Sequence, residues 1–225
     1  MWESGTKTSG SVDRLYAAVK EMAISFRFEP GQRVNEVAVA QHLGASRTPL
    51  REALNRLVAE GFLTYKRGRG FFCREFKPRE IFELYQFRSV LEIAAVRLAC
   101  EQATEAEVDE LDRFLRDTGP EAGGRTSEEL VALDEFFHER IMALTRNAEM
   151  TRVLANVNAR IKFFRWIDMD TKRIETQREH GEILEALRDR DADLAGRRMG
   201  DHIAKRLDQI TAAIKEGRSR IRLRA

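Results

Sequence analysis

The first third of this 225-residue chain carries the pattern that most restricts its fold: three helical stretches, then two β-prone runs around a basic tip that contains glycine. Apolar side chains recur at helical spacing in the helical stretches, and Asn35 and Ser46 are suitable N-caps. The helical stretches span residues 12–23, 35–44 and 46–61. The β-prone runs span residues 62–66 and 71–74. Because the connection between the last two helices is short and contains Gly44, this order predicts a winged helix-turn-helix.

Basic side chains gather where such a unit faces DNA. Residues 11–77 hold 12 Lys and Arg against 7 Asp and Glu, whereas residues 78–225 hold 26 against 29. The candidate contacts lie at the start of the third helix and on the hairpin tip, and they are Ser46, Arg47, Thr48, Arg51, Arg67 and Arg69. An arginine at a helix start in the major groove suits guanine or phosphate. Solvated surface is the better explanation for one isolated arginine, and some helix-turn-helix modules bind proteins, but the coincidence of these features favours DNA binding.

The remainder of the chain is predicted to be helical. The predicted helices span residues 81–102, from 104 to a loop at 119–124, 127–146, 149–165, 171–189 and 191–216. Thr104-Glu105-Ala106-Glu107 is predicted to be a capping box that opens the second of them. Six helices would pack as one bundle, so the fold class is mainly α. The predicted domain order is a disordered N-terminus at 1–10, a winged helix-turn-helix at 11–75, a linker at 76–79, a helical domain at 80–217 and a basic tail at 218–225. Two cysteines and the lack of a long apolar run predict a cytoplasmic protein without a membrane span.

Three histidines and one aspartate are predicted to point into the bundle. Asp134 and His138 share one helical face four residues apart, while His180 and His202 lie among apolar positions of two other helices. Neutral imidazole and carboxylate groups are ligands for zinc, nickel, cobalt, iron or manganese. By spacing alone, a hydrogen-bonded Asp–His pair remains the commoner explanation. His42, in the second helix of the first unit, is predicted to be a surface residue.

Arg88 also falls on an apolar stripe, between Leu84 and Leu91. A buried guanidinium requires an anion, and two partners are plausible on chemical grounds. One is a small carboxylate ligand, and the other is an ion pair with Glu92 four residues later.

The first unit resembles the DNA-binding domain of GntR-family regulators. The resemblance rests on Pro30-Gly31, on the string from Leu43 to Leu54 (LGASRTPLREAL) and on Gly68-Arg69-Gly70. It implies that Arg47 and Arg51 contact operator DNA, assisted by Ser46, Thr48 and Gly70. Where some members place an arginine at the start of the second helix, this chain has Asn35, Glu36 and Val37.

The helical part resembles the FCD ligand-binding domain of the FadR subfamily. The segments Asp134 to His138, Glu179 to Leu187 and Asp191 to His202 carry this resemblance. In metal-containing members an Asp and three His bind a divalent cation, which implies Asp134, His138, His180 and His202 as ligands here, with zinc as the first expectation. Members that bind fatty acyl-CoA have no such set. The resemblance also implies that Arg88, in an Arg-x-x-Leu-Glu context, holds the carboxylate of an effector.

Together, these patterns predict a ligand-responsive transcription regulator, expected to be a repressor, that binds a palindromic operator as a homodimer. The effector is predicted to be a small organic acid. The chief alternative is a metalloenzyme with an accessory DNA-binding domain, but no nucleophile–base pair or glycine-rich cofactor loop accompanies the ligands, so we expect no enzyme activity. A third alternative is a purely structural metal.

Overall fold

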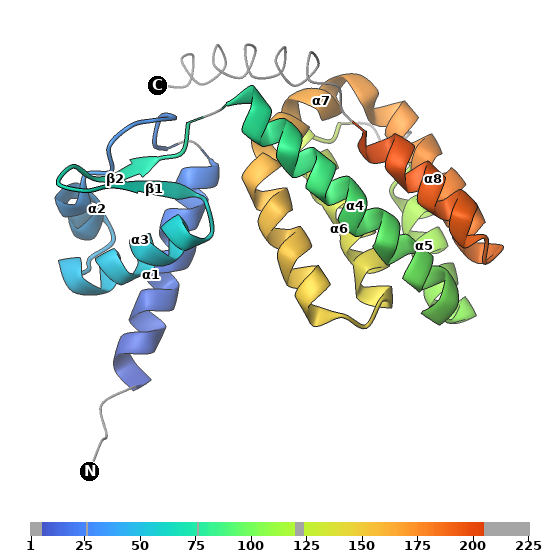
Figure 1. Cartoon of the computed structure of the whole chain (residues 1–225), viewed down its shortest axis with the longest axis horizontal. Coiled ribbons are helices and arrows are strands. Elements are labelled where there is room, and N and C mark those ends of the chain that lie inside the picture. Colours follow the sequence, from blue (N-terminus) through green and yellow to red (C-terminus); the bar gives the residue numbers. More distant parts are fainter. Residues whose placement is uncertain (1–5, 26, 76, 120–123, 205–225) are drawn as a thin grey trace. The chain divides into compact units, whose positions relative to one another are not determined.

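The computed structural model of the protein describes residues 6–25, 27–75, 77–119 and 124–204, in two compact units that divide between residues 76 and 77. Figure 1 shows the first as helices with a small hairpin and the second as a bundle of helices. None of the helices in these ranges combines the length and apolar character that a membrane span requires.

The first unit is built on a helical core. Its helices are α1 (Thr6–Ile24), α2 (Glu36–His42) and α3 (Arg47–Ala59). Leu15 and Val19 of α1 and Leu50, Leu54 and Leu57 of α3 are fully buried, which explains why these two helices pack against each other. Burying a large aliphatic side chain contributes roughly 1.5–3 kcal/mol, so this apolar contact between α1 and α3 positions α3.

The turn between α2 and α3 has the local chemistry that the sequence predicts. The side chain of Asn35 caps α2 by accepting a hydrogen bond from the Ala38 N–H at 3.2 Å. Gly44 follows α2 with a φ of +60°, a left-handed conformation that glycine adopts without a steric penalty. Ser46 occupies the N-cap position of α3, but its side chain makes no capping hydrogen bond.

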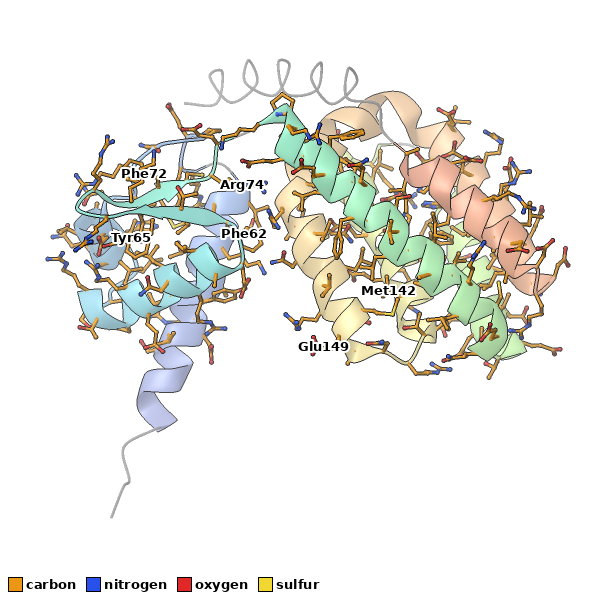
Figure 2. The ribbon with its side chains drawn as sticks, in the orientation of Figure 1. Phe62, Tyr65, Phe72, Arg74, Met142 and Glu149 are labelled. Atoms are coloured by element: carbon orange, nitrogen blue, oxygen red, sulfur yellow. The ribbon has the colours of Figure 1, made fainter. Side chains whose placement is uncertain are left out.

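A two-stranded antiparallel hairpin forms the wing. Strand β1 (Leu63–Lys66) pairs with β2 (Gly70–Cys73), so that Lys66 lies opposite Gly70 and Tyr65 opposite Phe71. Figure 2 shows Tyr65 and Phe72 on the two strands. The wing is further attached by an isolated bridge between Arg33 and Phe72.

The second unit contains five helices among the described residues. They are α4 (Pro78–Gln102), α5 (Glu105–Asp117), α6 (Ser127–Leu144), α7 (Ala148–Arg188) and α8 (Ala192–Ile203). Helix α4 packs against α6, α7 and α8. The predicted capping box is present at the start of α5, where the Thr104 and Glu107 side chains each bond the other's backbone N–H.

The main correction concerns α7. The sequence predicts separate helices at 149–165 and 171–189, but α7 runs unbroken over 41 residues. Residues 148–180 contain neither proline nor glycine, so nothing in the chain interrupts the backbone hydrogen bonding of the helix. The interval predicted to separate them, Trp-Ile-Asp-Met-Asp at 166–170, contains no residue that ends a helix.

Two helix bounds differ from the predicted domain limits. Residues 6–10, predicted to be disordered, belong to α1, because elongating a formed helix requires only one further residue to be ordered per hydrogen bond. The predicted linker at 76–79 is shorter, since α4 begins at Pro78, where the missing N–H of proline has no helical partner in any case. The predicted continuation of the last helix to 216 and the tail at 218–225 lie outside the described residues.

Candidate metal centre and nucleic-acid interface

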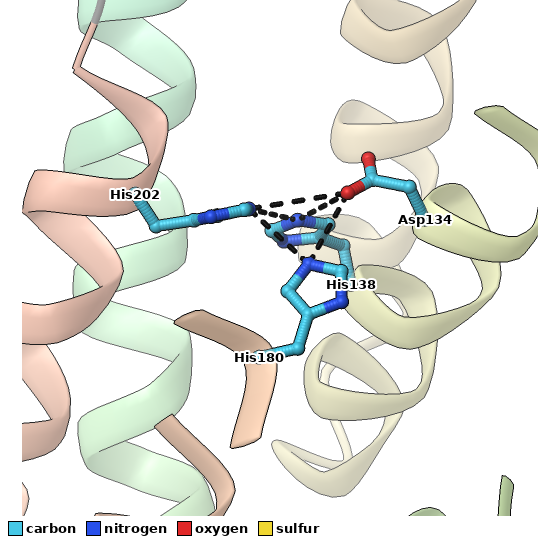
Figure 3. A group of neighbouring side chains, drawn as sticks. All are labelled: Asp134, His138, His180 and His202. Atoms are coloured by element: carbon cyan, nitrogen blue, oxygen red, sulfur yellow. Dashed lines mark hydrogen bonds and ion pairs between the residues drawn. The ribbon is translucent and has the colours of Figure 1, made fainter. Parts of the chain in front are cut away.

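Four side chains from three helices converge inside the second unit. Asp134 and His138 come from α6, His180 from α7 and His202 from α8. One ligand atom from each lies within 4.8 Å of all the others (Figure 3). His138 and His180 are 0% and 1% exposed, and Asp134 is 7% exposed. The structure thus brings together the residues that the resemblance implies.

Packing around α6 and α7 orients the side chains of Asp134, His138 and His180 towards one another. The four-residue spacing of Asp134 and His138 places both on the buried side of α6, between the apolar residues Val131 and Ile141. The Phe137 ring stacks on the His180 imidazole with ring centroids 4.0 Å apart. The His180 ring is therefore held by an aromatic neighbour rather than left to rotate.

The distances between donor atoms suit a small cation. Asp134 Oδ1 lies 3.2 Å from His180 Nε2, 3.6 Å from His138 Nε2 and 3.9 Å from His202 Nε2. His202 Nε2 lies 3.1 Å from His138 Nε2 and 3.2 Å from His180 Nε2. Ligands roughly 2.0–2.1 Å from a tetrahedral zinc ion lie about 3.3 Å apart. The three separations of 3.1 to 3.2 Å match this value, and the two from Asp134 Oδ1 to His138 and His202 are wider.

A second ring of charged groups orients the ligands. Glu92 accepts from Nδ1 of His138, and Glu179 accepts from Nδ1 of His202 at 2.7 Å. A carboxylate on Nδ1 selects the tautomer in which Nε2 keeps its lone pair for a metal. Asp134 Oδ2 accepts from Arg165, which leaves Oδ1 facing the three imidazoles.

Arg165 was not identified from the sequence. It lies on α7, is 5% exposed, and also contacts Glu135 at 3.1 Å. The available signal was an arginine close to the apolar residues Ile161 and Phe164, which is the same signal that singled out Arg88.

Burial sets the protonation of the cluster. It lowers the pKa of His180 to about 3 and lowers the pKa of His202 as well. Burial also opposes a charged His138, but the carboxylates of Glu92 and Asp134 raise its pKa above the usual value. Burial alone would raise the pKa of Glu92, yet the neighbouring Arg88 guanidinium and His138 imidazole lower it to about 2. At neutral pH His180 and His202 are therefore neutral and the carboxylates ionised, which suits metal ligation, whereas His138 has to give up the proton that its raised pKa favours when a metal binds.

The guanidinium of Arg88 is hydrogen-bonded through Nε, and its Nη2 has no partner among the described residues. Arg88 is 4% exposed, and its Nε donates to Glu92 Oε1 at 2.5 Å. Its buried Nη2 has no hydrogen-bond partner among the described residues. The ion pair with Glu92 is therefore formed, and a donor remains that an anion would satisfy. Through Glu92, Arg88 is also connected to His138.

The predicted DNA contacts at the start of α3 are exposed. Ser46, Arg47, Thr48 and Arg51 all lie on the surface, and His42 is exposed on α2 as predicted. Arg51 Nη1 lies 3.2 Å from Glu36 Oε2, so the acidic residue at the start of α2 orients Arg51. Because the Ser46 hydroxyl makes no capping bond, it is available to a ligand at this helix N-terminus.

The wing presents a second basic surface. Arg67 and Arg69 are exposed, and neither has a carboxylate partner within the part of the chain that the structure describes. The Arg69 guanidinium lies over the Phe72 ring, 5.7 Å from its centroid. Gly70 has a φ of +89°, and a Cβ added there would lie 3.8 Å from the guanidinium of Arg33. Arg33, which was not identified from the sequence, therefore lies next to the wing glycine.

An exposed arginine-rich helix start and wing on one unit, with a buried polar cluster in a second helical unit, define a winged-helix transcription regulator. The family model for bacterial regulatory proteins of the gntR family matches residues 11–73, and the FCD domain model matches residues 83–205. The chain belongs to the GntR family and carries an FCD domain. The family and the fold class predicted from the sequence are confirmed.

Similar proteins are regulators as well. The Nta operon transcriptional regulator of Aminobacter aminovorans is 43% identical over 194 residues, which cover 86% of this chain and 91% of that protein. The uncharacterized HTH-type transcriptional regulator YdhC of Bacillus subtilis is 29% identical, with coverage of 91% and 93%. A solved structure of a putative GntR regulator from Rhodococcus sp. RHA1 matches with a TM-score of 0.68 at 22% identity, covering 90% of this chain and 98% of that one.

Proposed function

We propose that the protein is a ligand-responsive repressor whose helical domain binds a divalent metal and a small organic acid. The observation that carries this proposal is the convergence of four ligand atoms within 4.8 Å, three of them on buried side chains, with carboxylates behind two of the imidazoles. A hydrogen-bonded Asp–His pair alone does not account for His138 and His202, whose Nε2 atoms lie 3.1 Å apart. Two neutral rings that donate through Nδ1 to Glu92 and Glu179 have only lone pairs to direct at each other, and a cation between them would satisfy both.

In this proposal Asp134, His138, His180 and His202 hold the cation, with zinc as the first expectation and nickel, manganese, cobalt or iron as other ions suited to the same ligands. When bound, the cation supplies a Lewis-acid site for a carboxylate oxygen. Glu92 and Glu179 keep the imidazoles in the ligating tautomer, and Arg165 keeps Asp134 in place.

Arg88 is proposed to recognise the effector. Its unpartnered Nη2 offers a charged donor in a buried environment, where such a hydrogen bond is worth more than in water. A small organic acid fits this donor because its carboxylate supplies the missing acceptor.

The first unit is proposed to bind a palindromic operator as part of a homodimer. Arg47 and Arg51, with Ser46 and Thr48, would meet base edges or phosphates, and Arg67, Arg69 and Gly70 would follow the neighbouring backbone or minor groove. One such module covers too little DNA for specificity in a genome, which is why two copies are expected to read one site.

Coupling between the units is proposed to run through α4. This helix begins at Pro78, directly after the division between the units, and carries Arg88 ten residues later. An effector that binds the unpartnered Nη2 of Arg88 adds a contact to α4 beside the Arg88–Glu92 pair. If that contact is stronger in one position of α4, it shifts the population of DNA-binding arrangements.

A thermal-shift screen of metal-loaded protein against small carboxylates tests this proposal. We expect an acid that raises the melting temperature, and we expect the rise to vanish in Arg88→Ala and after chelation. The same acid should change operator affinity in a mobility-shift titration. An acid that binds but leaves operator affinity unchanged at saturation would refute the regulatory part.

Two alternatives give different results in the same experiment. If the metal is purely structural, chelation lowers the melting temperature sharply and no acid in the panel stabilises the protein. If the bundle is a metalloenzyme, the stabilising acid is consumed, and product accumulates with the amount of metal-loaded protein.

A further inference from the structure

The outward face of α4 carries an apolar centre between charged ends. Val90 is 70% exposed and Phe87 is 48% exposed, although both lie on a helix whose other side is in the core. Gln86 and Ala94 are exposed beside them. The seam, as we call this stripe, consists of Arg79, Glu83, Gln86, Phe87, Val90, Ile93, Ala94, Arg97 and Glu101. In Figure 1, α4 lies on the near side of the bundle beside α8.

The charges of the seam are arranged antisymmetrically about Val90. Arg79 and Glu101 lie eleven residues to either side of it, and Glu83 and Arg97 lie seven residues to either side. At about 100° per residue all four fall within roughly 20° of the Val90 direction. A two-fold axis at Val90 therefore places each charge opposite a charge of the other sign.

We propose that this seam is the surface on which a second copy of the chain docks, with the two α4 helices antiparallel and Val90 at the two-fold axis. The inference rests on the homodimer of the proposed function and specifies the face that forms it. Arg97 of each copy would then meet Glu83 of the partner subunit, and Val90 would meet the partner's Val90. A two-fold interface is self-complementary, which is the property that this charge pattern has.

The spacing along the seam supports an extended antiparallel contact. Positions 79, 83, 86, 90, 93, 97 and 101 follow one another at intervals of three or four residues, the spacing that lets two helices cross at a shallow angle near 20°. A parallel pairing would place each charge opposite its own copy. A pairing centred near residue 81 would match Arg79 with Glu83 but leave Phe87 and Val90 uncovered.

The charged residues of the seam are exposed, and Arg97 lies along α8, where a Cβ added at Gly196 would come 2.7 Å from its Nε. Arg79 Nε lies 2.7 Å from Glu83 within the same helix, and Arg97 Nη2 lies 2.9 Å from Asp193 of α8, but these are surface pairs. Surface ion pairs contribute about 0–1 kcal/mol, so exchanging them for contacts with a second copy costs little. Arg88 lies on the opposite, buried side of α4, so the seam does not include the candidate effector residue.

Charge reversal tests the register. We expect Glu83→Arg and Arg97→Glu each to raise the dimer dissociation constant by at least about tenfold in sedimentation velocity of the full chain, because each creates two like-charged pairs per dimer. An equimolar mixture of the two variants should recover dimers, since the reversed charges then face opposite ones across the axis. The double variant should recover them as well.

Ile174→Glu is the matched control, because Ile174 is a 75% exposed apolar residue on α7. We expect it to dimerise as the unaltered chain does, and circular dichroism with a thermal melt checks that every variant is folded. Single variants that dimerise normally would overturn the proposal, as would folded single variants that do not recover on mixing.

A crosslink at the axis gives an independent readout. Val90→Cys should form a disulfide-linked dimer on mild oxidation, because facing positions of closely packed helices bring their Cα atoms within disulfide reach. Ile174→Cys and the unaltered chain should not, since Cys73 and Cys100 are buried. Absence of the crosslink in a dimeric Val90→Cys protein would overturn the seam alone, whereas an unaltered chain that stays monomeric would refute the proposed homodimer itself.

Discussion

At the scale of single residues, the candidate metal centre depends on imidazoles that have few other roles. His180 is 1% exposed, and its Nε2 lies 3.2 Å from both Asp134 Oδ1 and His202 Nε2. We expect His180→Ala to lose bound metal, as measured by elemental analysis after gel filtration. His42→Ala is the control, because it removes an exposed imidazole from the other unit. Full metal occupancy in His180→Ala would remove this residue from the ligand set.

Replacing a carboxylate that orients a metal ligand should weaken metal binding less than replacing the ligand itself. Glu179 accepts a hydrogen bond from Nδ1 of His202 at 2.7 Å. Glu179→Gln should weaken metal affinity by about 10–100-fold, as titration against a competing chelator would show, because the amide no longer provides a charged acceptor. Glu175→Gln, one turn earlier on the exposed side of α7, should leave the affinity unchanged. Equal affinities for the two variants would contradict an orienting role for Glu179.

A comparable prediction concerns Arg51, one of the proposed DNA contacts on α3. Arg51→Ala should weaken specific operator binding by about 1–3 kcal/mol if its guanidinium reads a base. Arg56→Ala offers a control on the same helix, since Arg56 pairs with Asp13 of α1 at 2.6 Å. A mobility-shift titration on operator and random DNA separates the possibilities: equal losses on both would reassign Arg51 to a phosphate contact.

At the scale of elements, α5 shows how a local pattern gives a testable pH dependence. Hydrogen bonds from the Thr104 backbone and from Arg146 lower the pKa of Glu107 from 4.5 to about 2. A carboxylate with a lowered pKa in the folded state stabilises the protein above pH 4.5 and loses that contribution as the pH falls towards 2.

The Glu107→Gln variant should therefore have a lower melting temperature than the unaltered chain at pH 6 and a smaller difference from it at pH 2.5 to 3, roughly the window set by the two pKa values. Differential scanning calorimetry across this range measures the effect. Glu105→Gln, in the same first turn, serves as the control. A Glu107→Gln deficit that stays constant with pH would mean that packing, and not charge, accounts for the loss.

The helix caps and the wing strands could be predicted from the sequence, and the length of α7 could not. The Asn35 cap, the Thr104–Glu107 box and the two wing strands form as predicted, because each depends on residues within a few positions of one another. The break predicted between 165 and 171 is absent from α7. Local composition cannot decide whether a helix continues when tertiary packing supports both of its ends.

At the scale of the whole molecule, metal and fold are expected to be linked. The four candidate ligands join α6, α7 and α8, so an ion held by them connects three helices. An ion present at about 100 times its dissociation constant stabilises the folded state by about 2.7 kcal/mol. Chelation should therefore lower the melting temperature of the unaltered chain and leave that of Asp134→Asn unaffected. A melting temperature that chelation leaves unchanged in both proteins would contradict the metal site.

Features that depend on neighbouring residues and on side-chain chemistry could be predicted from the sequence: a winged helix-turn-helix, a helical second unit, exposed arginines and four candidate metal ligands. How those ligands are supported depends on the folded chain. The contacts of Arg165 with Asp134, Glu92 with His138 and Glu179 with His202 join residues between 23 and 46 positions apart, so no local periodicity reveals them. Likewise, the choice between an ion pair and a ligand-binding role for Arg88 depended on the fold: the arginine pairs with Glu92 through one nitrogen, and packing leaves another without a partner.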